Sequence, residues 1–119
     1  MININNRSDV PIFEQIVLEI GRLIAYEILK PHEQLPSVRN LAKDLGINPN
    51  TVMRAYNACE QENLIYSRPG LGFFVQEENE GLDNLLKSSY QDLFKLIENI
   101  IQLGEPIEKI QTKIEEAFQ

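Results

Sequence analysis

The feature that most constrains the fold is a pair of helix-start signals placed on either side of a glycine. Ser37 offers a capping hydroxyl before an apolar repeat that ends at Gly46. Asn48, followed directly by a proline, supplies a second cap with the proline at the first helical position. The sequence therefore predicts two short helices, over about 37–45 and 49–62, joined by a tight turn. Two helices connected in this way form a helix-turn-helix.

The segments on either side complete a small domain. Isoleucines recur at helical spacing upstream of the pair and predict a longer helix over about 10–29, stopped by a proline. Downstream, residues 64–67 and 72–75 form two short strand patterns around a tip that contains proline and glycine. Helices followed by such a hairpin make a winged helix. We therefore expect a mainly α fold: a winged helix-turn-helix with a small β-hairpin wing, followed by a C-terminal helical pair.

The acidic segment 77–81 is the best candidate for a hinge between two parts of the chain. The predicted organisation is a winged-helix DNA-binding domain over 1–76, this hinge, and a helical dimerisation region over 82–119. Apolar residues in the last region alternate steps of four and three, which is typical of a packed helical seam. The predicted dimerisation residues are Leu86, Tyr90, Leu93, Ile97 and Ile100.

The distribution of charge matters more than the formal net charge of −7. Residues 1–76 hold seven Lys or Arg and eight Asp or Glu, a net charge of −1. Residues 77–119 hold four Lys and ten Asp or Glu, a net charge of −6. No acidic side chain lies between Leu45 and Cys59. The middle of the chain is therefore free to meet a polyanion.

The third predicted helix carries a polar stripe opposite its apolar one. Asn50, Arg54, Asn57 and Gln61 lie at i, i+4, i+7 and i+11, and Thr51 lies beside them. Arg can pair with guanine, Asn or Gln with adenine, and the Thr methyl can touch thymine. A solvated polar face, which any surface helix has, is the alternative for the helix taken alone.

Further contact candidates lie in the elements on either side of this helix. The start of the second helix could bind phosphate where it crosses the DNA backbone. The hairpin tip combines one arginine with two glycines, which would let the backbone approach a groove wall, although turn geometry alone also favours glycine there. These candidates are Ser37, Arg39, Lys43, Arg68, Gly70 and Gly72.

Other chemistry has little support in the sequence. One cysteine and one histidine leave no multi-cysteine zinc site, and no catalytic triad, phosphate-binding glycine loop or dinucleotide fingerprint is present. We expect His32 to be a surface residue, Cys59 a core residue, and the protein to be no enzyme and to need no metal or cofactor. No membrane-spanning run or secretory signal is visible, so a cytoplasmic protein without a membrane partner is expected.

Residues 10–76 resemble the DNA-binding domain of GntR-type bacterial transcription regulators. The motifs that carry the resemblance are Leu35-Pro36-Ser37-x-Arg39, Leu41-Ala42, Leu45-Gly46, Asn50-Thr51-Val52 and Gly70-x-Gly72-x-x-Val75. The short helical remainder is similar to the YtrA-like branch, which implies a homodimeric winged-helix repressor, often of an ABC-transporter operon. The resemblance also implies DNA contacts by Arg39, by Asn50, Thr51 and Arg54, and by Gly72. Pro49 departs from the polar or basic contact residue that many members have there.

The resulting hypothesis is a sequence-specific regulator, most simply a repressor, that binds double-stranded operator DNA as a dimer on palindromic sites. A winged-helix protein-interaction module without DNA binding is the alternative, and the acid-free span from Leu45 to Cys59 counts against it. The operator, the regulated genes and any small-molecule effector are not specified by the sequence.

Overall fold

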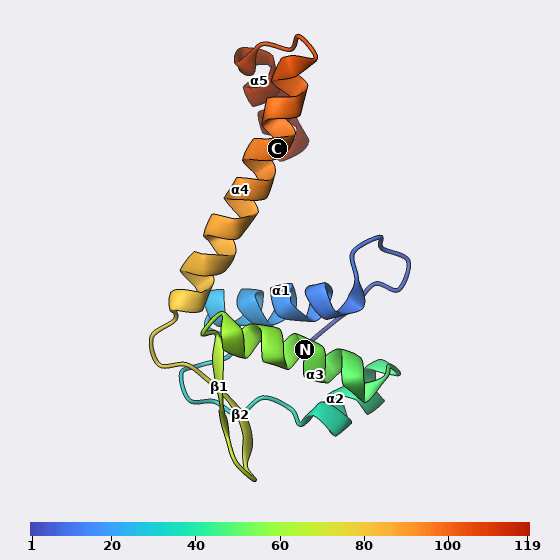
Figure 1. Cartoon of the computed structure of the whole chain (residues 1–119), viewed down its shortest axis with the longest axis vertical. Coiled ribbons are helices and arrows are strands. Elements are labelled where there is room, and N and C mark those ends of the chain that lie inside the picture. The colour runs from blue at the N-terminus through green and yellow to red at the C-terminus, as the bar shows by residue number, and fades with distance from the viewer. The chain divides into compact units, whose positions relative to one another are not determined.

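The computed structural model describes residues 1–119 as five helices and one two-stranded antiparallel sheet (Figure 1). The elements are α1 (Ile12–Ala25), α2 (Val38–Leu45), α3 (Pro49–Gln61), β1 (Ile65–Arg68), β2 (Gly72–Val75), α4 (Glu80–Gln102) and α5 (Ile107–Ala117). The chain divides into two compact units, Met1–Leu85 and Leu86–Gln119. The predicted fold class, a mainly α winged helix-turn-helix with a hairpin wing and two C-terminal helices, is confirmed.

The helix-turn-helix is built by the predicted caps. The Ser37 hydroxyl accepts a hydrogen bond from the backbone N–H of Asn40 at 3.1 Å, and the Asn48 side chain accepts one from the N–H of Asn50 at 2.8 Å. Gly46 ends α2 in the left-handed region, with φ of 68°. Because a residue with a Cβ is strained at this φ, the glycine allows the chain to turn sharply from α2 into α3.

The first helix is shorter than predicted. It ends at Ala25 rather than near residue 29, because Glu27 adopts a left-handed backbone with φ of 58°. The N–H groups of Ile28 and Leu29 both turn back to the carbonyl oxygen of Leu23, at 2.8 and 3.0 Å. This turn buries Leu29 and leaves Ile28 half exposed, so Ile28, the last isoleucine of the predicted helix over 10–29, lies beyond the helix and outside the core.

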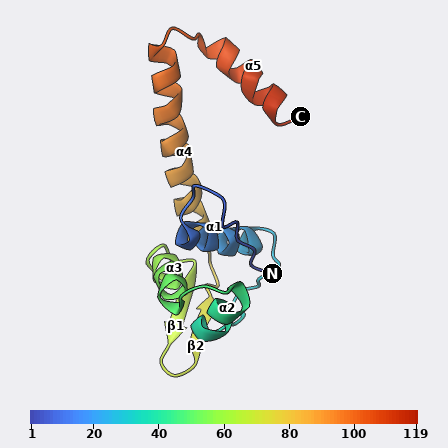
Figure 2. The same ribbon diagram turned by 90° about the vertical axis from the view of Figure 1, so that its right-hand side faces the viewer.

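The core of the first unit lies where α1 packs along α3, as both ribbon views show (Figures 1 and 2). The apolar side predicted for the third helix is fully buried; its members are Val52, Ala55, Tyr56 and Cys59. Tyr56 also joins three elements. Its hydroxyl donates to the carbonyl oxygen of Pro36, just before α2, at 2.7 Å. Its ring packs edge-on against the ring of Phe73 on β2, with 5.1 Å between the ring centres.

The wing is a short antiparallel hairpin in which Ile65 pairs with Val75 and Arg68 with Gly72. The segment before α2 lies along the other edge of β2. There the N–H of His32 donates to the carbonyl oxygen of Val75 at 2.8 Å, and the N–H of Leu35 donates to that of Phe73 at 2.9 Å. The base of the wing is therefore held on both sides, while its tip extends from the domain.

The start of α4 is packed against the end of α3. Gly81 is buried, and a Cβ at this position would lie 2.5 Å from the carbonyl oxygen of Glu62. The Asn79 side chain donates to the carbonyl oxygen of Leu64 at 3.3 Å. Part of the acidic segment expected to act as a hinge, 77–81, is thus already helical, and the first compact unit extends to Leu85.

The second unit consists of the rest of α4 and α5. Figure 2 shows α5 running back from the turn at Gly104, which has φ of 96°. Ile110 is the single buried residue of this unit, and most of its large apolar side chains are exposed. No helix of the chain combines the length and the apolar character needed to cross a membrane.

Candidate nucleic-acid interface

The predicted polar stripe on α3 is exposed. Asn50, Arg54, Asn57 and Gln61 all lie at the surface, and Thr51 is partly buried in the first turn. The first turn of α3 has few free amides, because Pro49 has no N–H and the N–H groups of Asn50 and Thr51 donate to the side chain and the carbonyl oxygen of Asn48. The helix that the sequence selected for base contacts therefore presents hydrogen-bonding side chains rather than burying them.

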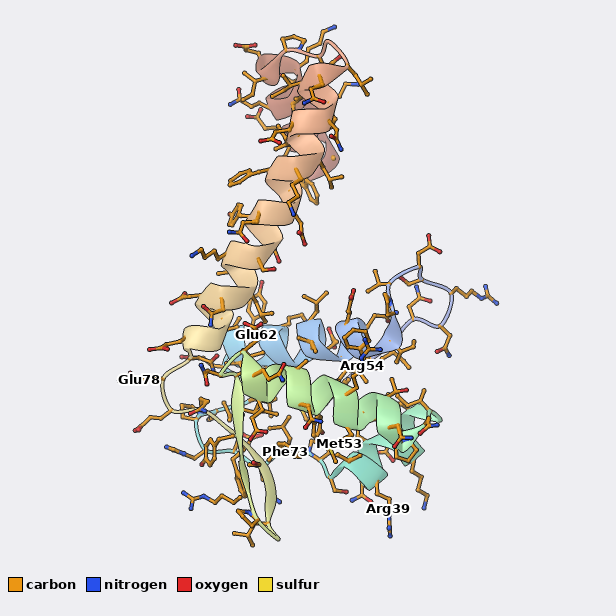
Figure 3. All side chains as sticks on the ribbon, in the orientation of Figure 1. Arg39, Met53, Arg54, Glu62, Phe73 and Glu78 are labelled. Carbon is orange, nitrogen blue, oxygen red and sulfur yellow. The ribbon has the colours of Figure 1, made fainter.

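The side chain of Arg54 points to one edge of this stripe. Its guanidinium carbon lies 3.7 Å from the centre of the Phe13 ring on α1, and Figure 3 shows Arg54 on the side of α3 that faces α1. A cation over an aromatic ring at this distance is an attractive contact. DNA contact by Arg54 stays a prediction, and the geometry gives this residue a structural partner that periodicity does not reveal.

Met53 is a surface residue that the sequence interpretation passed over. Its side chain is 41% exposed, and Figure 3 shows it on the side of α3 away from Arg54. A signal for it was present, because it is a large apolar residue that lies outside the apolar stripe of Val52, Ala55, Tyr56 and Cys59.

The start of α2 presents basic groups without acidic partners. Ser37, Arg39 and Lys43 are exposed, and Figure 3 shows Arg39 extending from the domain. The chain has one salt bridge, between Arg22 and Glu19, and His32 lies 3.9 Å from the Glu77 carboxylate, so the predicted contact cations take part in neither contact. A cation that has no internal partner can pair with a phosphate without first breaking a salt bridge.

The tip of the wing carries Arg68, whose guanidinium lies 5.6 Å from the centre of the Tyr66 ring. Gly70 and Gly72 have φ of 74° and 118°, a region that side chains disfavour. The Gln34 side chain donates to the carbonyl oxygen of Leu71 at 2.6 Å and braces the tip. Turn geometry by itself accounts for both glycines, so the argument for wing contacts depends on Arg68.

His32 and Cys59 occupy the environments expected of them. His32 is exposed, and its Nδ1 lies 2.8 Å from the Tyr66 hydroxyl oxygen, so it ties the segment before α2 to β1. Cys59 is fully buried, and burial raises the pKa of its thiol to about 12. A thiol of such a high pKa carries almost no thiolate at neutral pH, which makes it a poor redox switch.

The predicted dimerisation residues lie along α4 and are exposed within the single chain. Leu86 and Tyr90 are 57% and 55% exposed, Leu93 and Ile100 about two-fifths, and Ile97 is partly buried. Where α4 and α5 meet, Ile100, Ile110, Ile114 and Phe118 help to line an apolar groove of about 450 Å³. This amount of exposed apolar surface is unusual for a unit that remains alone in water.

Comparison with known proteins was made on the sequence and on the fold. Residues 12–75 match the family described as bacterial regulatory proteins, gntR family. The HTH-type transcriptional repressor YtrA of Bacillus subtilis (strain 168) is 37% identical over 121 residues, which cover 98% of this chain and 91% of that protein.

Two solved structures are informative. The crystal structure of a transcriptional antiterminator from Listeria monocytogenes EGD-e matches with a TM-score of 0.78 and 33% identity, covering 100% of this chain and 90% of that one. The DNA-binding domain of AraR in complex with operator ORX1 matches with a TM-score of 0.55 and 25% identity, covering 61% of this chain and 90% of that one.

Proposed function

The chain belongs to the GntR family of bacterial regulatory proteins, and from this membership we propose that it is a transcriptional repressor that binds operator DNA in a sequence-specific way. The observation that carries the proposal is the surface formed by the start of α2, the outer side of α3 and the wing. The proposed contact residues on it are Ser37, Arg39, Lys43, Asn50, Thr51, Asn57, Arg68, Gly70 and Gly72, with Arg54 at its margin. A repressor of this kind acts in the cytoplasm, where its DNA lies.

Different parts of this surface would do different work. The unpaired Arg39 and Lys43 suit phosphates on either side of the groove, and the amides of Asn50 and Asn57 suit base edges. The wing brings Arg68 to a second stretch of DNA backbone. The second unit is acidic and would be repelled by DNA phosphates, so we assign no DNA contact to it.

We further propose that the second unit joins two copies of the chain. Its exposed apolar residues on α4 and α5 would be covered by the same surface of a second copy, since symmetric pairs are the commonest oligomers. A twofold dimer presents two α3 helices to a palindromic site. The similarity to the YtrA branch makes an ABC-transporter operon the first target to test.

The decisive experiment is footprinting of the full-length protein on DNA from upstream of its own gene, with a scrambled fragment of equal length and composition as the control. We expect two protected half-sites related by a twofold axis. Equal affinity for both fragments, or no binding to either, would overturn the proposal and favour the protein-interaction alternative.

A further inference from the structure

The identity of the bases that α3 can recognise follows from how its side chains are divided between two sides. Arg54 is the only cation of α3, and its guanidinium lies over Phe13 of α1. On the side away from α1 the helix carries Met53 and Asn57, and its one carboxylate there, Glu60, is held by Ser67 of the wing. Bidentate pairing of arginine with guanine, the commonest specific contact of such helices, then has no donor on that side.

Helical spacing and three hydrogen bonds identify the side that remains. Residues at i, i+3, i+4 and i+7 share one face of a helix, and Met53, Tyr56, Asn57 and Glu60 have this spacing. Tyr56 donates to the carbonyl oxygen of Pro36 just before α2. The Glu60 carboxylate accepts from the N–H and the hydroxyl of Ser67 in the wing, at 3.0 and 2.6 Å. Met53 and Asn57 thus lie on the face of α3 that is shared with the start of α2 and the wing.

That same face belongs to the surface proposed above to meet DNA. Met53 is 41% exposed there although it is apolar. It lines a surface hollow together with Asn50, Asn57 and Arg54. Asn50 lies three residues before it and Asn57 four residues after it, and both amides are exposed. The face therefore places one flexible apolar side chain between two amides.

This combination matches one kind of base pair. An Asn amide pairs with the N6 and N7 atoms of adenine, and an apolar side chain contacts the C5-methyl group of thymine. Methionine suits a methyl group because its side chain is flexible and polarisable. We infer that Met53 is a specificity-determining residue that contacts a thymine methyl group, and that α3 selects A·T pairs in each half-site. This inference depends on the proposed operator binding.

The test removes only the methyl group from the DNA. Once footprinting has defined the operator, duplexes are made in which each thymine of a half-site is replaced in turn by uracil, which keeps the base-pairing atoms. We expect the full-length protein to bind about fourfold more weakly for each methyl group that Met53 contacts, from the transfer free energy of one buried carbon. The Met53→Ala variant should bind the thymine and uracil duplexes equally.

Three further variants make the result specific. Met53→Leu should keep the preference for thymine, and Arg54→Ala should keep it as well. Leu18→Ala removes a large apolar side chain from α1 that is 54% exposed, more than Met53, and controls for a general loss of apolar surface. Thermal unfolding of each variant checks that the fold is retained.

The outcomes separate the two proposals. If the wild type binds every uracil duplex as tightly as the thymine duplex, or if Met53→Ala keeps the preference for thymine, the role of Met53 is refuted while operator binding stands. Loss of the preference in Arg54→Ala would return base recognition to the arginine. If no DNA is bound in preference to the scrambled control, operator binding itself fails.

Discussion

Replacing Tyr56 with phenylalanine removes a single oxygen atom from the centre of the helix-turn-helix. Tyr56 is fully buried, and its hydroxyl donates at 2.7 Å to the carbonyl oxygen of Pro36, next to the Ser37 cap of α2. Burial raises the pKa of this phenol well above its usual range, so the hydroxyl keeps its proton and remains a donor at neutral pH.

The expected magnitude follows from this geometry. Tyr56→Phe preserves the ring, and with it the edge-on contact with Phe73, so the packing term is almost unchanged. What is lost is one hydrogen bond, and a partly buried carbonyl oxygen is left without its donor. Such a loss costs about 1–2 kcal/mol of the free energy of unfolding. For a domain of about 60–100 residues, each kcal/mol lowers Tm by about 4–8 °C.

Urea denaturation followed by circular dichroism, at a fixed protein concentration, measures this loss. Tyr26→Phe is the matched control, because Tyr26 is 74% exposed and its hydroxyl has no partner in the chain. We expect the control to stay within about 0.5 kcal/mol of the wild type. If Tyr56→Phe costs no more than the control, the hydroxyl does not hold α2 against α3 and the reasoning fails.

Three further predictions concern the DNA surface, the second unit and the start of α4. Arg39→Ala should make the log–log dependence of operator affinity on salt shallower by about 0.9 per protomer, and an unchanged slope would place Arg39 away from phosphate. Replacing Leu93 and Ile97 together with aspartate should give a folded monomer in sedimentation that binds the operator weakly, and a dimer that persists would move the interface elsewhere. Gly81→Ala should lower the free energy of unfolding by about 1–3 kcal/mol in urea denaturation, because its Cβ would overlap the carbonyl oxygen of Glu62; full stability would contradict the close packing.

Local signals made the helix-turn-helix predictable. Ser37, Gly46 and Asn48 each act within a few residues of their own position, so their effects can be inferred from neighbouring letters of the sequence. The end of α1 had no such signal, because Glu27 is neither glycine nor proline and still adopts a left-handed backbone. Whether Ile28 or Leu29 reaches the core is decided by packing.

The same distinction separates the parts of the candidate site. Periodicity correctly indicated which side of α3 is buried and which is exposed. It could not indicate that Arg54 turns to Phe13, because the two residues are 41 positions apart in the sequence and meet only after α1 packs along α3. Because the Arg54 guanidinium lies over Phe13, we assign the base contact of α3 to the exposed side chain of Met53 instead.

The close packing of Gly81 against the end of α3 limits where the C-terminal helices of another protein could be joined to this domain. A new C-terminal helix that enters at residue 77 would have to reproduce the glycine, the Asn79 side-chain contact and the apolar residues Leu82 and Leu85 that pack on the core. A junction placed after Leu85 keeps all of these within one parent. Chimaeras joined there should fold with many different tails, so the recombination point that preserves DNA binding lies inside a helix rather than in the loop that precedes it.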